Sequence, residues 1–531
     1  MKTFIITGCC ALLFFTACHK SPAVNPVATQ PTGKDTITAL TSYRPLFHFT
    51  PGANWINDPN GLVYVNGSYH IFSQYNPSGY VWGNMNWDQA NSPDFFSWKE
   101  TGIAIKELFN TDGSNSMIFS GSAVVDSTNS SGFATQAGAS PLVAVYTLNN
   151  TAANGNAISQ TQGISYSLDN GQTWTAYNKN PVLDINSTQF RDPKVFWYGP
   201  TSKWIMVVSK PDVDSVRIYS SSNLKKWTFQ SDFGAIGNTN QVWECPDLFP
   251  LSIEGSSAKK WVLTVSGGGN EYGYGGMQYF IGNFDGSNFT ADNDNYPLYV
   301  DYGKDYYAGV TFNNVPASDG RRVMIAWANN WSYAGSIPTT GYRGQYAVPR
   351  SLSLRKVNNS DGYHLLQTPV AEISQHETSA YTSASKTINN TVMQLDSVSG
   401  TSLDIQFNLS MGTAASAGIQ VLKGGTQATV ITINKALSTV SLDRTNSGTN
   451  SFASQFPSVE TAKMDNVDMT NLTCRILIDQ SIVEVFINEG EYAITDLVFP
   501  TQANGGIELF ATTGAATFSN IAVKTVNKTI H

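Results

Sequence analysis

Short apolar runs, broken by Gly, Asn, Asp and Pro, recur along the chain from Tyr43 onward. Clear examples span residues 61–65, 203–208, 260–265 and 322–327. β-branched and aromatic residues dominate these runs, and long stretches with helical periodicity are absent. This pattern is typical of strands separated by tight turns. The sequence therefore predicts an all-β protein.

A polar turn followed by an aromatic residue recurs behind several of these runs. The copies span residues 92–98, 167–174 and 221–227, and a weaker copy spans residues 283–289. Ordinary hairpins can share such turn chemistry by coincidence. Irregularly spaced copies of one hairpin unit are, however, typical of a β-propeller whose loops carry insertions. We therefore favour a β-propeller.

The composition changes near residues 360–376, beyond which Ser, Thr, Ala and Val dominate and aromatic residues become sparse. Residues 403–409 and 474–479 alternate between apolar and polar positions. Strands of this kind bury one face and expose the other, as in a two-layer sandwich. We expect a propeller over residues 43–365 and a β-sandwich over residues 376–531.

The N-terminal segment predicts export. Lys2 precedes a mostly apolar run that is too short for an ordinary membrane span and ends at Cys18. Residues 15–18 (Phe-Thr-Ala-Cys) resemble a bacterial lipoprotein lipobox, which implies a signal peptide over residues 1–18 and lipidation of Cys18. A plain secretory signal is the alternative, and it also exports the chain. Residues 19–42 are rich in Pro, Thr, Ser and Ala and indicate a disordered tether.

The charge balance narrows the class of partner. The net charge is -8, and charged residues make up only 13% of the chain against 12% aromatic residues. This argues against nucleic acid or an anionic membrane surface and suits a neutral substrate such as a sugar. We expect a monomer that touches a membrane only through its lipid anchor. The six His show no metal-ligand spacing, and no phosphate loop or serine-esterase motif is present, so we expect no metal and no cofactor.

Three acidic residues share a local setting: Asp58, Asp192 and Glu244 are each followed within two residues by Pro and then by an apolar strand. Proline removes a backbone donor and restricts the residue before it to extended geometry. For a single Asp-Pro, a strand-entry turn is the commoner interpretation. In a propeller, however, the starts of the innermost strands surround the channel, so three blades can direct three carboxylates to one point.

Such a cluster suits glycoside hydrolysis with retention, which needs two carboxyl groups about 5–5.5 Å apart with opposite tasks. One attacks as an ionised nucleophile, and the other must start protonated. Glu244 lies between Trp243 and Cys245, an apolar setting that would raise its pKa. Asp58 has Asn57 and Asn60 as possible donors, which would favour its ionised form.

At these residues the chain resembles glycoside hydrolase family 32, the invertases, inulinases and levanases. Residues 55–61 (Trp-Ile-Asn-Asp-Pro-Asn-Gly) differ from the family motif only by Ile in place of Met. The other elements that resemble family motifs, in the family's order, are residues 119–122, 191–193, 244–246, 327–331 and 481–486. The resemblance covers about residues 43–531.

The resemblance implies a five-bladed propeller followed by a β-sandwich, and a retaining hydrolase of β-fructofuranosidic bonds in fructans or sucrose. It implies Asp58 as nucleophile, Glu244 as acid/base and Asp192 as a transition-state stabiliser that holds fructose hydroxyls. The implied substrate-binding residues are Asn57, Gln74, Trp82, Phe119, Ser120, Arg191 and Trp331. Arg191 would also neutralise the cluster and help set the carboxylate pKa values.

One segment departs from the family: residues 83–90 lack both His of a motif that many relatives carry, which bears on pocket shape and preferred chain length. Three alternatives stay open: a fructosyltransferase, a non-catalytic carbohydrate-binding lipoprotein, and an inverting arabinan-type hydrolase. The presence of both Asp58 and Glu244 disfavours the second, and the motif at residues 55–61 disfavours the third. Levan, inulin and sucrose all stay open as substrates, as do attack at the chain end and within the chain.

Overall fold

A computed structural model describes residues 43–267, 276–292, 296–357, 362–464, 467–502 and 505–529. The predicted signal peptide, Cys18 and the tether lie outside these residues. Within the described ranges the chain consists almost entirely of strands. Its helical segments there are the 3-10 turns η1 (Gly199–Thr201), η2 (Pro211–Val213), η3 (Ala334–Ser336) and η4 (Ala371–His376). In this part of the chain, no helix has the length and hydropathy of a membrane span.

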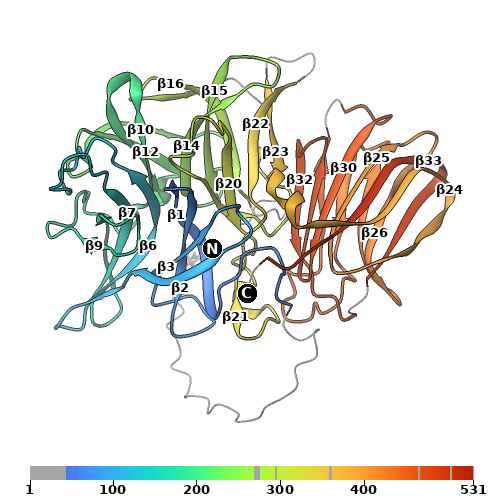
Figure 1. The fold of residues 1–531 in the computed structure, drawn as a ribbon, viewed down its shortest axis with the longest axis horizontal. Helices are drawn as coiled ribbons and strands as arrows, with labels where there is room; N and C mark the ends of the chain where they lie inside the picture. The colour runs from blue at the N-terminus through green and yellow to red at the C-terminus, as the bar shows by residue number, and fades with distance from the viewer. Residues whose placement is uncertain are drawn as a thin grey trace, which may run out of the picture. The chain divides into compact units, whose positions relative to one another are not determined.

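The first domain is a five-bladed β-propeller, as predicted, with four antiparallel strands in each blade (Figure 1). Blade I contains β1 (Asn54–Val65), β2 (Ser68–Asn76), β3 (Asn86–Ser92) and β4 (Lys99–Ile105). Blade II contains β6 (Asn115–Val125), β7 (Leu142–Thr151), β8 (Ala157–Ser167) and β9 (Thr175–Ala176). Blade III contains β10 (Arg191–Tyr198), β11 (Lys203–Lys210), β12 (Ser215–Ser221) and β13 (Thr228–Gly234). Blade IV contains β14 (Glu244–Ser252), β15 (Lys259–Ser266), β16 (Gln278–Phe284) and β17 (Phe289–Ala291). Blade V contains β19 (Tyr307–Thr311), β20 (Arg322–Trp327), β22 (Arg350–Lys356) and β23 (Tyr363–Pro369).

The first strands of the blades form a closed ring. β1, β6, β10, β14 and β19 each contact the first strand of the next blade, and β19 contacts β1. In addition, β21 (Tyr342–Arg343) pairs in parallel with the start of β1. Two short strands, β5 (Leu108–Phe109) and β18 (Leu298–Tyr299), extend blades II and IV. The ring places the starts of five strands around one channel mouth.

The repeated polar turns join the third strand to the fourth strand in blades I to IV. In each copy an Asp or Asn side chain caps backbone amides of the turn. Asp94 accepts from the amide of Ser97 at 2.7 Å, and Asn223 accepts from the amide of Lys226 at 3.0 Å. The four copies therefore mark equivalent positions, which confirms the repeat as the signature of the propeller. The corresponding connection of blade V includes residues 358–361, which lie outside the described ranges.

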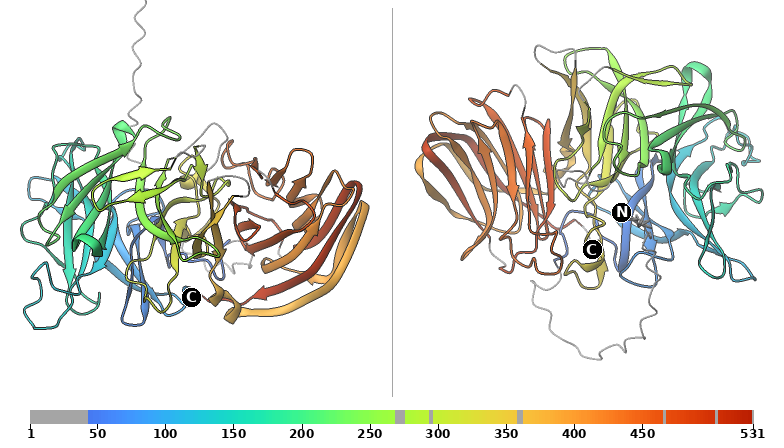
Figure 2. Two further views of the ribbon diagram at one scale, coloured as in Figure 1. Left: turned by 90° about the horizontal axis from the view of Figure 1, so that it is seen from above. Right: turned by 180° about the vertical axis from the view of Figure 1, so that it is seen from behind.

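The second domain has two layers, as expected of a sandwich, but its strands form one continuous hydrogen-bonded sheet. Its strands are β24 (Glu377–Ser399), β25 (Ser402–Ser410), β26 (Ser416–Gly424), β27 (Gln427–Asn434), β28 (Thr439–Asp443), β29 (Val459–Lys463), β30 (Leu472–Asp479), β31 (Ile482–Ile487), β32 (Tyr492–Leu497) and β33 (Gly506–Val526). β33 pairs with β26 through its first half and with β25 through its second half. β24 follows β33 along this path, and both strands curve from one layer into the other (Figure 2).

The expected solvent-exposed face of residues 474–479 is buried at Leu477 and Asp479, whereas Arg475 is partly exposed as expected. Leu477 belongs to a hydrophobic cluster with propeller residues, and Asp479 is fully buried. Apolar and polar positions do alternate here, but residues of the propeller side cover Leu477 and Asp479, which would otherwise face solvent. Asp479 satisfies this burial by accepting from the backbone amides of Phe47 and His48 at 2.8 and 3.0 Å. Asp479, at the end of β30, therefore marks an interface rather than a surface.

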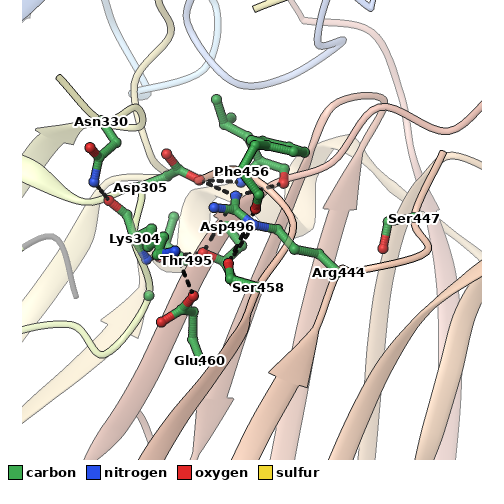
Figure 3. A network of polar contacts seen from close by, with 12 residues as sticks. Lys304, Asp305, Asn330, Arg444, Ser447, Phe456, Ser458, Glu460, Thr495 and Asp496 are labelled. Carbon is green, nitrogen blue, oxygen red and sulfur yellow. Dashed lines mark hydrogen bonds and ion pairs between the residues drawn. The ribbon is translucent and has the colours of Figure 1, made fainter. Parts of the chain in front are cut away.

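Buried charges hold the propeller to the sandwich. Arg444 of the sandwich donates from Nη1 to Asp305 Oδ2 at 2.6 Å and from Nη2 to Tyr333 Oη at 2.9 Å. Lys304 Nζ lies 3.6 Å from Glu460 Oε1 of β29 (Figure 3). This network ties the loop that precedes β19 to the outer strands of the sandwich.

A second network of the interface contains His48 and Arg350 as its cations. The ring nitrogens of His48 lie 2.9 Å from Asp479 Oδ2 and 2.9 Å from Glu484 Oε1. Arg350 donates to Asp301 Oδ2 at 2.9 Å and to Glu484 Oε2 at 2.5 Å. All five side chains are buried, and each takes part in at least one of these contacts, although Nε of Arg350 has no hydrogen-bond partner.

Candidate active site

A β-bulge interrupts the innermost strand of every blade close to its start. The pairing with the second strand shifts between residues 56 and 59, 118 and 121, 191 and 194, 244 and 247, and 307 and 310. Two residues of each inner strand therefore leave the ladder at the same level of the channel. Bulges re-aim side chains and are frequent beside active sites. The five bulges direct side chains from five blades to one mouth.

Asp58 is the second residue of the blade I bulge, and it is 9% exposed. Its Oδ2 accepts from Ser120 Oγ at 2.6 Å, and its Oδ1 accepts from Asn57 Nδ2 at 3.1 Å. The Asn60 amide instead donates to the backbone oxygen of Asp58 at 3.2 Å, so only one of the two expected asparagine donors reaches the carboxylate. Burial raises the pKa of Asp58, and the hydrogen bond from Ser120 only partly opposes this shift.

Asp192 is the first residue of the blade III bulge and lies beside Asp58. Its Oδ2 accepts from the backbone amide of Cys245 at 3.0 Å, and Cys245 Sγ lies 3.4 Å from Asp58 Oδ2. Burial raises the pKa of Asp192 to about 7, with the charges of Glu244 and Asp58 adding to the shift and Arg191 opposing it. The blade III bulge thus holds a carboxylate in a setting that favours its neutral form.

The backbone at two of the three proline-flanked acids is not extended, contrary to expectation. Asp192 precedes Pro193 with φ 66°, and Cys245 precedes Pro246 with φ 48°. The left-handed region is unfavourable for such residues and persists where surrounding contacts fix it. Here the amide of Asp192 donates to Thr147 Oγ1 at 3.0 Å, while the amide of Cys245 donates to Asp192. The bulge geometry overrides the local preference of the residue before proline.

Glu244 begins β14 and is the most exposed of the three acids, with a side chain that is 23% exposed. Arg191 donates to its Oε1 from Nε at 2.9 Å and from Nη2 at 2.8 Å. Tyr307 donates from its hydroxyl to Glu244 Oε2. Trp243 points elsewhere, since its indole N–H donates to Asn238 O at 2.9 Å. The carboxylate therefore contacts polar donors rather than the apolar neighbours that its sequence position suggested.

Ten side chains line a pocket of about 150 Å³ at this mouth. They are Asn57, Asp58, Gln74, Trp82, Phe119, Ser120, Arg191, Asp192, Glu244 and Trp331. The structure thus brings together every residue to which the sequence assigned catalysis or substrate binding in the folded chain. The acids Asp58 and Asp192 are buried in the pocket, whereas Trp82 and Trp331 are 44% and 43% exposed at its rim.

Asn86 and Gln89 stand where many relatives carry the two histidines, and neither lines this pocket. Asn86 accepts the backbone amide of Glu107 at 2.9 Å, and Gln89 contacts His70 Nδ1 at 3.2 Å. These side chains support blade I from behind the pocket wall. Among the described residues, no group of three His, Cys, Asp or Glu side chains is arranged to hold a metal ion.

Tyr307 is the site residue that the sequence reasoning did not identify. Its neighbours in the chain, Tyr306 and Ala308, are neither proline nor acidic, so the signal that marks the three acids is missing here. Its position is nevertheless equivalent to those of Arg191 and Glu244, because all three immediately precede the bulge of their strands. An alignment of the inner strands on their bulges would have placed it at the mouth.

The fold and the site together define a class of protein. Glycoside hydrolysis needs a pair of carboxyl groups in different environments beside a sugar-sized pocket. Here three carboxylates and one guanidinium surround a small pocket with aromatic rings at its rim. A propeller that holds such a cluster has the components of a glycosidase.

Comparisons with known proteins identify the family. The sequence profile of the glycosyl hydrolases family 32 N-terminal domain matches residues 48–369, and the profile of the family's C-terminal domain matches residues 372–525. The chain therefore belongs to glycoside hydrolase family 32 and is an enzyme of the fructofuranosidase type.

Several relatives cover nearly the whole described chain. A levanase of Bacillus subtilis (strain 168) is 40% identical over 495 residues, which cover 92% of this chain and 71% of the relative. An extracellular exo-inulinase of Aspergillus niger is 37% identical over 522 residues, which cover 92% of this chain and 95% of the relative. The crystal structure of an exo-inulinase from Aspergillus awamori matches with a TM-score of 0.84 at 34% identity, covering 93% of this chain and 100% of that one.

Proposed function

We propose that this enzyme hydrolyses β-fructofuranosidic bonds in levan, inulin or sucrose with retention of configuration, releasing fructose from the chain end. The observation that supports this most directly is the pocket itself, where Asp58, Asp192 and Glu244 lie around one small cavity. The relatives named as levanase and exo-inulinase support a fructan as substrate. The proposal also assigns separate tasks to the three carboxyl groups.

In the first step Glu244 protonates the departing glycosidic oxygen while Asp58 attacks C2 of the fructosyl unit. The C2–O bond to the leaving sugar breaks, and an ester bond to Asp58 forms. The difference in exposure supports this assignment. Glu244 lies nearer the solvent, where the leaving group departs, whereas Asp58 lies at the buried end of the pocket.

In the second step Glu244 accepts a proton from water, the water oxygen bonds to C2, and the ester to Asp58 breaks. Free fructose leaves, and both carboxyl groups return to their starting states. Asp192 would hold fructose hydroxyls and stabilise the positive charge that develops on the ring. Arg191 would orient Glu244 through its two N–H donors.

The size of the pocket supports attack at the chain end. Its volume of about 150 Å³ is well below the roughly 300–1,000 Å³ of pockets for drug-sized ligands. It suits one terminal fructosyl unit rather than an internal segment of a chain. Trp82 and Trp331 at the rim would contact the next unit through their ring faces.

The test is product release from levan, inulin and sucrose by the wild type, Asp58→Asn and the exposed control Asp112→Asn. We expect fructose alone from the wild type and the control, and none from Asp58→Asn. NMR of the first product should show retained configuration.

A ladder of oligosaccharides would reject attack at the chain end, and an inverted product would reject the covalent mechanism. Transfer of fructose to added sugars in place of water would assign the chain as a transferase. No product from any fructan would leave a carbohydrate-binding role.

We also infer export, with lipidation at Cys18 and a tether over residues 19–42 that holds the catalytic domain away from a bacterial membrane. The short apolar run, the lipobox-like residues 15–18 and the relative named as extracellular support this. Metabolic labelling with a fatty acid should mark the wild type but not Cys18→Ser. A labelled Cys18→Ser protein, or an unlabelled wild type, would reject the anchor. A monomer mass in light scattering is expected for a protein that lacks residues 1–18.

A further inference from the structure

A second and larger cavity opens at the opposite end of the inner strands. Its volume is about 490 Å³, within the roughly 300–1,000 Å³ typical of ligand pockets. Its walls come from the far ends of β6, β10 and β14, from the start of β20 and from the segment after β19. Nothing in the proposed mechanism uses it.

Aromatic rings form one wall of this distal cavity. Trp197 is 43% exposed and packs edge-on against the buried Trp204, with ring centroids 5.1 Å apart. Tyr198 and Trp261 continue the wall, with centroids 5.9 Å apart. A half-exposed indole that is held by a buried ring presents a rigid, amphipathic surface. Such a surface packs against the apolar face of a sugar at a low cost in conformational entropy.

Polar side chains form the floor of the cavity, and they differ in how many of their N–H groups have hydrogen-bond partners. Lys194 Nζ lies 3.0 Å from Asp247 Oδ2 and donates to Thr311 O, so its charge is paired. Arg322 donates from Nη1 to Phe312 O at 3.1 Å. Among the described residues, Nε and Nη2 of Arg322 have no hydrogen-bond partner, so this guanidinium edge is available to acceptors in the cavity.

The distal cavity is separate from the active site, although β10 contributes to both. Trp197 lies five positions after Asp192 on this strand, about 17 Å at the usual rise of a strand. A cavity of about 10 Å³, with room for one water molecule, lies between them and is lined by residues that include Asp192 and Lys194. A sugar unit does not fit into this constriction, so we expect a ligand of the distal cavity to enter from its outer end.

We propose that the distal cavity is a second binding site for fructan, which holds the polymer while the active site removes its ends. The indole of Trp197 packs against a fructosyl unit, and Arg322 donates hydrogen bonds to its hydroxyl oxygens. The choice of fructan as the ligand rests on the proposed function. The cavity itself is defined by its aromatic wall and by the free donors of Arg322.

The test is native affinity electrophoresis through gels that contain levan or inulin, in an Asp58→Asn background so that the polymer persists. We expect Trp197→Ala to weaken retention about tenfold on at least one polymer. The matched control is Phe229→Ala, because Phe229 is an exposed ring of the same blade that does not line the cavity. Its retention should equal that of the Asp58→Asn parent.

A second measurement separates this proposal from the proposed function. In the wild-type background, Trp197→Ala should hydrolyse a fructan trisaccharide with unchanged kcat/KM, because hydrolysis of so short a substrate depends only on the active site. If the wild type failed to hydrolyse fructans, that would appear in this assay, while the retention assay would still report on the cavity. Equal retention of Trp197→Ala and Phe229→Ala would overturn the proposal. So would a thermal shift of the protein by small carboxylates such as citrate without any retention on fructan.

Discussion

Two clusters of buried charge use the same residue types with opposite results. At the channel mouth, three carboxylates share the single guanidinium of Arg191. There, burial and like charges raise the pKa of Asp192 to about 7, and burial also raises that of Asp58. At the propeller–sandwich interface, burial also acts to raise the pKa of Glu484, yet Arg350 and His48 lower it overall. The number of nearby cations and hydrogen-bond donors, and not burial alone, decides which carboxylates are stable in their ionised form.

This difference matches the different tasks of the two clusters, catalysis at the mouth and stabilisation of the fold at the interface. Around Arg350 and His48, the interface pairs Asp301, Asp479 and Glu484 with cations and backbone amides, so these charges stabilise the folded state only as a complete set. The mouth leaves acids short of partners, which makes their protonation states responsive to a substrate. The bulges permit this arrangement, because they hold Asp58 and Asp192 in place through the backbone, whereas Glu244 is held by its ion pair with Arg191.

The largest expected effect is on the chemistry of the mouth. Glu244→Gln removes the proton donor, and we expect kcat for fructan to fall on the order of 10³-fold with no loss of thermal stability. Fructosyl fluoride, whose leaving group needs no proton, should react with the variant far better than fructan does. Stopped assays on both substrates measure this. An equal loss on both substrates would argue against the acid role.

The next effect is on stability and belongs to the interface. Arg350→Met leaves Asp301 and Glu484 buried without their cation, and we expect a loss of about 3–5 kcal/mol in the free energy of unfolding. Arg355→Met is the matched control, since it lies on the same strand but pairs with Glu254 and Glu489 at the surface. Its cost should stay below about 1 kcal/mol. Denaturant unfolding measures both, and equal losses would contradict the comparison.

A third prediction concerns pH, because the mouth and the interface should respond differently. The pKa of Asp192 is raised from 3.8 to about 7, so its contribution to stability is present at low pH and is lost as pH rises through that window. Asp192→Asn should therefore match the wild type in Tm near pH 4 and exceed it by a few degrees near pH 8, while activity is lost.

His48 provides the matched titration at the interface. Burial acts to lower its pKa, but its hydrogen bonds to the carboxylates of Asp479 and Glu484 raise it to about 9. Its stabilising contribution is therefore full below about pH 6.5 and declines toward pH 9. Scanning calorimetry of Asp192→Asn and His48→Gln across pH 4–9 should place their differences from the wild type in these separate windows. Parallel curves would show that neither site titrates as described.

The smallest effect expected is from Tyr307→Phe. This change removes one donor to Glu244 while Arg191 continues to hold the carboxylate. We expect kcat to fall roughly tenfold, in line with one hydrogen bond to a charged group, with KM and Tm little changed. A rise in KM alone would instead indicate that Tyr307 binds substrate.

The sequence predicted the mouth better than the interface, for a physical reason. Asp58, Asp192 and Glu244 carry a local signal, an acid before proline at a strand entry, and the repeated turns indicate that such entries converge. Asp479 and Leu477 carry no signal for their partner, because alternation looks the same whether water or another domain covers the face. Tyr307 was missed since a single aromatic residue is more often core than site.

Local preference also failed where tertiary contacts opposed it. The residue before proline favours extended backbone, yet Asp192 and Cys245 adopt left-handed φ angles. Hydrogen bonds between blades fix this geometry, and no window of a few residues contains them. The prediction of strands and turns therefore succeeded, whereas the shape of the bulges required the whole ring.

The repetition of the bulge has a consequence for how this scaffold can change. The position that precedes each bulge points three polar side chains, Arg191, Glu244 and Tyr307, into one arc, whereas blades I and II place the buried Ile56 and Ile118 there. Blades III, IV and V thus direct this position toward a common centre, whereas blades I and II use it for core packing. A substitution at one of these positions, by natural variation or by design, can therefore change the chemistry of the site without changing the backbone that supports the other positions.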